Sequence, residues 1–302
     1  MQRDGLFLYL FKKNINMMKK IIFSTLIFTA IDVNAQQPTQ KIVVAKGQRI
    51  TIVDSMTMNI VQEAMGQIME IPGNTTSSTM LEIKETSDNK TIIASTLKKT
   101  SFNMSMMGQE MNYDSEKPSD KETEAGKALE EKLNKTEDIT LDNMGKSLPS
   151  ATPVVKKETE EQNGGSVDMI KNLTGMTSGN SAENAFMLLS SGSKVGSSWA
   201  DSTVNEGIKT MRTYIIKSMT TNEAVITVMG VISGSRKIEM QGMEMNMNAG
   251  GKVDGEIIVD ITNGLVKKRT TIIEPNNSIE VMGMSIPVTG KVSTVSYYTT
   301  VQ

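Results

Sequence analysis

The sequence predicts a mainly β, α+β fold: a curved antiparallel sheet or half-barrel, built from two β-meanders with short helices inserted between them. Two observations support this. Runs rich in Val, Ile and Thr alternate with polar residues over much of the chain, which is typical of strands. In addition, residues 80–113 align without a gap on residues 214–247, at a spacing of 134 residues. Such a repeat indicates a duplicated supersecondary unit.

Residues 1–35 are expected to lie outside the folded protein, as an over-extended gene start plus a cleaved signal peptide. Lys19 and Lys20 precede the apolar run 21–31, and small residues allow cleavage between Ala35 and Gln36. Met18 is the natural start in this interpretation. The apolar run is shorter than the roughly 20 residues of a membrane-spanning helix, so no transmembrane segment is expected in the mature chain.

The composition argues against catalysis and against nucleic acid. The chain contains no cysteine and no histidine, which excludes disulfides, thiolate metal sites and the commonest general base. We therefore expect no enzyme activity, no catalytic residue, no resident metal and no cofactor. Without residues 1–35, 27 basic residues face 32 acidic ones, a net charge of −5. A mildly acidic protein lacks the basic patch that nucleic acid requires. An exported protein without disulfides suits a bacterial periplasm or the cell exterior.

Residues 36–114 are predicted to form the first meander. Strands are expected at 41–47 and 48–59, where β-branched residues alternate with polar ones, and again at 79–85 and 91–97. Ser87-Asp88-Asn89 is expected to form the turn between the last two of these strands, because Asp and Asn tolerate unusual φ angles. In the second copy, Thr221-Asn222-Glu223 is expected to form the same turn.

Residues 115–192 are predicted to form a charged, helical insert. Ser119 and Glu122 have the spacing of a capping box, and apolar residues follow at helical intervals. A strand is expected at 137–146, ending in a turn around Asp142. Residues 149–166 are polar and predict a flexible loop. A further helix is expected over 181–189, with Ser181 as N-cap and Gly192 just beyond its end.

Residues 193–302 are predicted to form the second meander, and 36–302 to fold as one unit. Trp199, the single tryptophan, opens this half and is interpreted as a structural anchor rather than a binding residue. Asp260-Ile261-Thr262-Asn263-Gly264 predicts a hairpin turn. Two more strands are expected to complete the chain.

Three glycines lie within methionine-rich strands: Gly108, Gly242 and Gly283. The alternation of apolar residues changes phase around each of them. A bulge or bend at glycine would absorb the extra residue and keep one apolar face pointing inward, so bends in a curved sheet are the favoured interpretation. A tight hairpin at the same glycines is the competing one.

The methionines allow three interpretations. The favoured one is core filler, since methionine fills irregular gaps where aromatic residues are scarce. The second is an adaptable wall around an apolar ligand. The third is a Cu(I) or Ag(I) site made of thioethers, although strand alternation explains the same spacing. The candidate ligand-binding residues are Met104, Met106, Met111, Met240, Met243, Met245 and Met247.

The sequence resembles an uncharacterised family of secreted bacterial β proteins, defined by a domain of unknown function. The resemblance is carried by the predicted signal peptide, the methionine strands, the Asp260–Gly264 turn and Lys194-Val195-Gly196-Ser197-Ser198-Trp199. More loosely, the duplicated meander is similar to the half-barrels of periplasmic lipoprotein carriers. We expect an exported, non-enzymatic protein whose sheet binds or presents an apolar small molecule, a lipid or a partner, although no protein partner can be named. The alternatives are a copper- or silver-handling protein and a surface-assembly component.

Overall fold

The computed structural model describes residues 39–64, 66–106, 109–130, 132–149, 181–240, 243–281 and 283–301. Residues 37–302 form one compact unit. The predicted leader, most of the predicted flexible loop and residues 167–180 lie outside the described residues. The strands are β1 (Arg49–Ala64), β2 (Gln67–Thr86), β3 (Lys90–Met106), β4 (Gln109–Asp114), β5 (Thr136–Asp142), β6 (Ser198–Asn205), β7 (Ile208–Met219), β8 (Glu223–Met240), β9 (Met243–Asp260), β10 (Val266–Val281) and β11 (Met284–Val301). The helices are α2 (Pro118–Lys121), α3 (Glu124–Glu130) and α5 (Ser181–Asn184).

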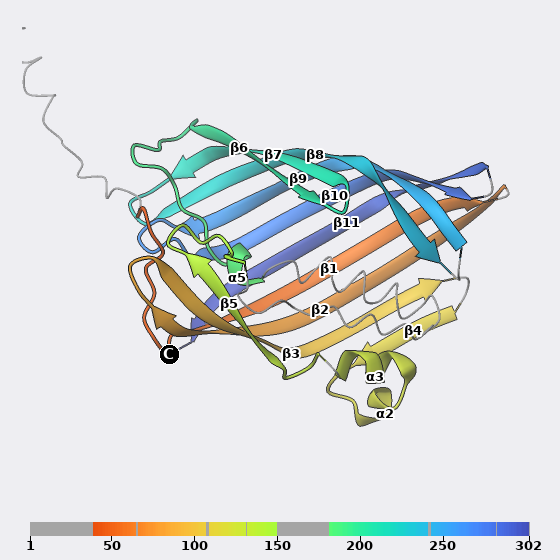
Figure 1. The fold of residues 1–302 in the computed structure, drawn as a ribbon, viewed down its shortest axis with the longest axis horizontal. Coiled ribbons are helices and arrows are strands. Elements are labelled where there is room, and N and C mark those ends of the chain that lie inside the picture. Colours follow the sequence, from red (N-terminus) through yellow and green to blue (C-terminus); the bar gives the residue numbers. More distant parts are fainter. Residues whose placement is uncertain are drawn as a thin grey trace, which may run out of the picture. The chain divides into compact units, whose positions relative to one another are not determined.

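All these strands belong to one curved antiparallel sheet, which confirms the predicted fold class (Figure 1). The order is β4-β3-β2-β1-β11-β10-β9-β8-β7-β6, with β5 pairing on β3 beside this path. The two meanders meet where β1 pairs with β11, in a register that begins at Arg49 opposite Val301. The described sheet stays open, because its order ends at β4 on one side and at β6 on the other.

The sheet has one buried and one exposed face, as β1 illustrates. Ile50, Ile52, Met56 and Met58 are almost fully buried, whereas Val53, of the opposite parity, is 40% exposed. Successive side chains of a strand point to opposite faces, so this alternation defines an inner face with the core and an outer face toward solvent. We use these two names for the whole sheet.

The inner face carries two apolar clusters. The first contains Ile50, Ile52 and Tyr298 together with Phe186 and Leu189, which follow α5. The second is rich in methionine and receives Leu129 from α3, so the helical insert covers this part of the sheet. Its buried members are Met56, Met58, Ile71, Phe102, Met104, Tyr113 and Leu129.

The repeat appears in the structure as two equivalent hairpins, β3–β4 and β8–β9. Thr220, rather than Thr221, occupies the place of Ser87: the Ser87 amide donates to the Lys90 carbonyl, and the Thr220 amide donates to the Glu223 carbonyl. The predicted turn in the second copy is therefore one residue too late. The reason is that β8 has 18 residues and β3 has 17, so a gapless alignment that matches the hairpin ends misses the turns by one position.

The preferred interpretation of the glycines as strand bends is wrong. Gly283 lies between Val281 and Met284, which pair with each other as the ends of β10 and β11. Its φ of +79° is a conformation that side-chain-bearing residues rarely adopt. The alternation changes phase here because the chain reverses, so the competing hairpin interpretation holds.

Gly108 and Gly242 lie outside the described residues, but the structure shows how the strands on either side of them pair. Met106 at the end of β3 pairs with Gln109 at the start of β4. Met240 at the end of β8 pairs with Met243 at the start of β9. The flanking segments are thus opposite arms of two hairpins and not halves of one bent strand.

Two predicted elements around the core are wrong in extent. Residues 41–47 form no strand; instead the Ile42 and Val43 amides donate to the carbonyls of Asn143 and Asn263, in two different turns. The helix predicted over 181–189 stops at Asn184. Phe186 then forms a β-bridge with Leu265. The helix ends here because burying the Phe186 side chain in the first cluster is more favourable than another helical turn.

The predicted helix of the insert is divided into α2 and α3. Pro118 occupies the first turn of α2, but no side chain caps this helix, so the predicted capping box does not form. The Thr123 hydroxyl accepts a hydrogen bond from the Gly126 amide and caps α3 instead. The turn around Asp142 forms as predicted, with Gly145 at φ +83°.

Candidate functional site

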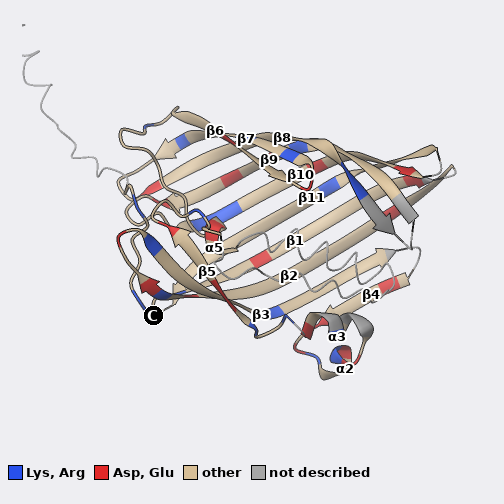
Figure 2. Cartoon of the chain, in the orientation of Figure 1, with Lys and Arg blue, Asp and Glu red and all other residues tan. Residues whose placement is uncertain are grey.

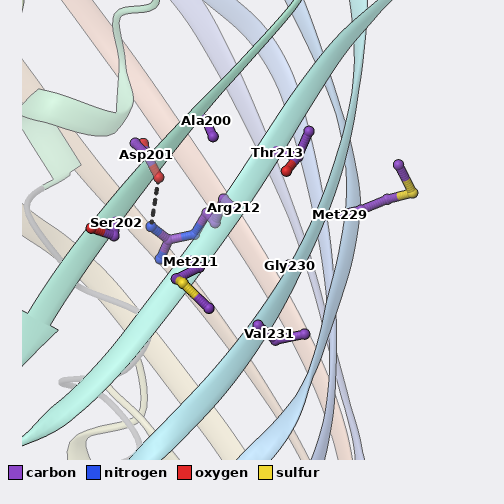
Figure 3. A pocket seen from close by; sticks show the side chains of 9 residues that line it. All are labelled: Ala200, Asp201, Ser202, Met211, Arg212, Thr213, Met229, Gly230 and Val231. Carbon is purple, nitrogen blue, oxygen red and sulfur yellow. Dashed lines mark ion pairs between the residues drawn. The ribbon is translucent and has the colours of Figure 1, made fainter.

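An open groove of about 710 Å³ crosses β6, β7 and β8. It lies on the outer face, on the three strands that end the sheet order at the β6 side. Figure 3 shows the side chains that line it. We call it the outer groove and define it by Ala200, Asp201, Ser202, Met211, Arg212, Thr213, Met229, Gly230 and Val231.

The apolar walls of the outer groove come from cross-strand neighbours. Met211 of β7 is directly opposite Val231 of β8, and Thr213 is opposite Met229. Such opposite residues lie close enough for their side chains to touch. Met211 is 41% exposed, Met229 44% and Val231 45%, so three apolar side chains share one open surface.

The sequence explains why apolar side chains reach this face. In β7, Tyr214 and Ile216 alternate into the core, which turns Met211 to the outside. In β8, residues 224–232 are apolar at nearly every position, so this strand is apolar on both faces. Sequence reasoning missed Met211, Met229 and Val231. A strand without polar alternation was the signal that could have revealed them.

The edge strand β6 is fixed to β7 by side chains of the inner face. The ring of Trp199 stacks on that of Tyr214, with centroids 5.2 Å apart and planes inclined by 9°. The Tyr214 hydroxyl donates to Asp201 Oδ2 at 2.9 Å. Burial, followed by the charge of Asp201, raises the pKa of Tyr214 to about 12.

An ion pair completes this anchor: Arg212 Nη1 lies 3.7 Å from Asp201 Oδ1 (Figure 3). Both side chains are about one-third exposed, so the ion pair by itself contributes little to the stability of the fold. Trp199 also packs against the first core cluster. The floor of the outer groove is thereby held to the rest of the sheet through Asp201, Arg212 and Tyr214.

The structure brings together only some of the predicted methionines. Met104 and Met111 face each other across β3 and β4 in the second cluster, where Met104 is buried and Met111 half-buried. Met245 is buried and Met247 half-buried in β9. Four strands, β2, β1, β11 and β10, separate β3 from β9 in the sheet order. The backbones of Met106, Met240 and Met243 lie in the paired strand ends, and their side chains are not among those described.

Met58 shows how the second cluster is packed. Gly73 of β2 lies opposite Met58 of β1 on one side and opposite Met104 of β3 on the other. A Cβ at Gly73 would lie 3.0 Å from Met58 Cε, so the missing side chain provides the space that Met58 fills. The methionines of this cluster act as core filler, as the favoured interpretation predicts.

The chemistry available to the outer groove is that of an apolar surface. Within the described ranges, no group of three or more His, Cys, Asp or Glu residues could hold a metal ion. Figure 2 shows basic and acidic residues dispersed along the strands rather than gathered by sign. No helix in the part of the chain that the structure describes is long and apolar enough to cross a bilayer.

A comparison with known protein families shows to which family this chain belongs. Residues 88–266 match the profile of a family described as a family of unknown function, DUF6263. The chain belongs to DUF6263. The matched region runs from the β2–β3 turn to the first residue of β10, so the DUF6263 region includes the whole insert and the outer groove. No match was found among curated proteins.

Solved structures that resemble this DUF6263 protein are distant. Lipovitellin, studied for lipid–protein interactions, gives a TM-score of 0.45 at 10% identity, over 83% of this chain and 25% of lipovitellin. An outer membrane channel from Pseudomonas putida F1 gives 0.27 at 8% identity, over 87% and 99% of the two chains. The translocator domain of the autotransporter NalP from Neisseria meningitidis gives 0.20 at 7% identity, over 93% and 97%. This chain spans about a quarter of the lipovitellin chain. These TM-scores are all too low to support a statement about function.

Proposed function

We propose that this protein is an exported, non-enzymatic carrier that holds an apolar small molecule, such as a lipid acyl chain, in the outer groove. The observation that carries the proposal is a cavity of about 710 Å³ whose walls include three exposed apolar side chains. Cavities that bind small molecules in proteins have roughly 300–1,000 Å³ and mostly apolar linings. The outer groove has both properties.

Covering the exposed walls would provide the binding free energy. Fully burying a Met or Val side chain contributes roughly 1.5–3 kcal/mol. Met211, Met229 and Val231 are 41–45% exposed. A ligand that covers them would therefore gain on the order of 1 kcal/mol from each.

The residue types suit a ligand of variable shape. Methionine is unbranched and polarizable, so Met211 and Met229 can adjust to different acyl chains. Between Met229 and Val231, Gly230 allows β8 to approach β7 closely, because a Cβ there would collide with the Met211 carbonyl oxygen. Ser202 of β6 offers a hydroxyl group where the apolar part of a ligand would end.

A fluorescent dye that brightens in apolar surroundings, anilinonaphthalene sulfonate, tests this proposal. We expect saturable binding to the wild-type protein. Met211→Gln and Met229→Gln should each weaken the dye's Kd about fivefold, which corresponds to the loss of about 1 kcal/mol. A long-chain fatty acid should displace the dye.

Val53→Gln is the matched control, because Val53 is 40% exposed on the outer face of β1, outside the outer groove. This variant should bind dye like the wild type. Absence of saturable binding, or equal affinity of all three variants and the wild type, would overturn the proposal.

Export is a separate part of the proposal and rests on the sequence. The Lys19-Lys20 pair, the apolar run 21–31 and the small residues before Gln36 support it. Fractionation of bacterial cells followed by N-terminal sequencing should recover a chain that begins at Gln36 in the periplasm or the medium. Recovery of the uncleaved chain in the cytoplasm would contradict export.

A further inference from the structure

A second, polar pocket of about 120 Å³ lies on the inner face, between the two apolar clusters. Three neighbouring strands provide its base: Asp54 of β1 is opposite Ser296 of β11, which is in turn opposite Arg269 of β10. Asn184, the last residue of α5, also lines the pocket. Along β1, Asp54 falls between Ile52 of the first cluster and Met56 of the second. We call this the inner pocket.

Arg269 enters the inner pocket with unused hydrogen-bonding capacity. Its Nη2 donates to the Asn184 carbonyl oxygen at 3.1 Å. Its Nε is buried and has no hydrogen-bond partner. A guanidinium group remains charged at any pH a protein tolerates, and a buried donor without an acceptor is costly. Arg269 lines the pocket, so a ligand carboxylate there would give this guanidinium a charged acceptor.

Asp54 is the opposite charge in the same pocket. It is 9% exposed, and burial raises the pKa of its carboxyl, while hydrogen bonds from Ser296 and Ser77 act in the other direction. The Ser77 bond is long, at 3.5 Å. Among the residues that the structure describes, neither Asp54 nor Arg269 forms an ion pair. A carboxyl group and a guanidinium thus share one small cavity without touching each other.

Two separated charges of opposite sign are complementary to a molecule that carries both charges itself. Adjacent strands lie about 4.8 Å apart, so Asp54 and Arg269, two strands apart, leave a short polar gap with Ser296 in the middle. A volume of about 120 Å³ equals roughly four water molecules at 30 Å³ each. This space admits a small molecule and excludes a large side chain.

We propose that the inner pocket binds a small α-amino acid, with its carboxylate on the Arg269 guanidinium and its ammonium group on Asp54. Ser296 lies between the two charged ends, and Thr271 and Thr294 add hydroxyl groups to the same wall. The bound carboxylate pairs with the guanidinium charge of Arg269, which has no ion-pair partner among the described residues. The bound ammonium group stabilises the ionised form of Asp54, which burial otherwise disfavours. This site is independent of the outer groove.

Titration calorimetry with glycine, L-alanine, acetate, methylamine and L-phenylalanine tests the proposal on the wild-type protein. Glycine and L-alanine should bind at least about tenfold more tightly than acetate or methylamine, each of which offers only one charged end. L-phenylalanine should bind more weakly than glycine because its ring exceeds the pocket. No heat with glycine and alanine, or acetate binding as tightly as glycine, would overturn the proposal.

Two substitutions locate the site. Asp54→Asn and Arg269→Gln keep the approximate shape of each side chain and should each weaken glycine binding at least about tenfold. Arg49→Gln is the matched control, because Arg49 pairs with Glu82 near the start of β1 and lies outside the inner pocket. Unchanged affinity in both pocket variants, or an equal loss in the control, would contradict the assignment. Far-ultraviolet circular dichroism verifies that each variant is folded, and the ligand series on the wild type does not depend on them.

Discussion

Trp199 stacks on Tyr214 almost in parallel, with ring centroids 5.2 Å apart, and this contact ties the edge strand β6 to β7. Stacked aromatic pairs contribute about 0.5–1.5 kcal/mol beyond the area they bury. The Tyr214 hydroxyl continues the connection to Asp201, which lines the outer groove. The geometry of the groove therefore depends on a contact made on the opposite face of the sheet.

Tyr214→Phe should weaken this anchor while keeping the stacked ring. The substitution removes only the hydrogen bond to Asp201, and a hydrogen bond to a charged group contributes about 1–2 kcal/mol here because Asp201 is partly exposed. Urea unfolding of the wild type, Tyr214→Phe, Asp201→Asn and the double variant measures the coupling. Additive effects of the two single substitutions would show that the hydrogen bond does not contribute.

The raised pKa of Tyr214 also predicts a pH dependence. The group loses its proton near pH 10 in the unfolded chain and near 12 in the folded protein. The folded state thus holds a proton that the unfolded state releases, and the free energy of unfolding falls as pH rises through this window. Tyr214→Phe should show a shallower fall. Ultraviolet absorbance of tyrosinate checks the titration directly; a normal pKa for all tyrosines would contradict this account.

Two glycine substitutions should differ in cost. A Cβ at Gly230 would collide with the Met211 backbone carbonyl, which cannot move without breaking the β7–β8 pairing. A Cβ at Gly73 would meet mainly Met58, whose flexible end can shift. We expect Gly230→Ala to cost about 2–3 kcal/mol and Gly73→Ala about 1 kcal/mol or less. Denaturant unfolding measures both, and equal losses would contradict the steric argument.

Asp142 should contribute to stability through its turn. Its Oδ1 accepts hydrogen bonds from the Met144 and Lys146 amides, both at 2.8 Å. Asp142→Ala removes both and should cost about 1–2 kcal/mol. Asp88→Ala is the control, because the Asp88 side chain is 98% exposed. Among the described residues it forms one ion pair, with Lys41 at 3.9 Å. A loss in Asp88→Ala as large as that in Asp142→Ala would contradict this reasoning.

The raised pKa of Asp54 predicts a similar loss of stability with rising pH, on the acid side. Its pKa is raised from an ordinary value of 3.8, mainly by burial. Above about pH 4 the unfolded chain releases this proton before the folded protein does, so ionisation of Asp54 lowers stability as pH rises. Asp54→Asn should gain stability relative to the wild type between about pH 4 and neutrality. A constant difference over that range would show that burial does not govern Asp54.

The sheet could be predicted from the sequence because its signals are local. Period-2 alternation located the strands, and Asp260 with Gly264 marked a turn that forms: Asp260 Oδ1 accepts from the Thr262 amide at 2.9 Å. The repeat also indicated two equivalent meanders. Errors arose where two local signals compete. At the glycines, an apolar phase change is produced equally by a bend and by a chain reversal, and pairing alone distinguishes them.

The candidate sites could not be predicted, because they depend on neighbours across strands. Met211 and Val231 are 20 positions apart in the sequence and become opposite only through the β7–β8 register. Asp54 and Arg269 are far apart in the sequence. They line one pocket because β11 pairs with β1 on one side and with β10 on the other. Of the methionine motif that dominates the sequence, Met104 is buried in the second cluster and Met111 packs against it.

The most direct test of the central claim locates the bound molecule. A fatty acid carrying a diazirine group is bound to the protein, activated by light, and the labelled peptides are identified by mass spectrometry. An apolar ligand in the outer groove predicts label in residues 208–219 and 223–240, reduced in Met211→Gln and Met229→Gln but unchanged in Val53→Gln. Label confined to β1 and β3, or label no greater than that of an unbound control, would contradict the outer groove as the binding site.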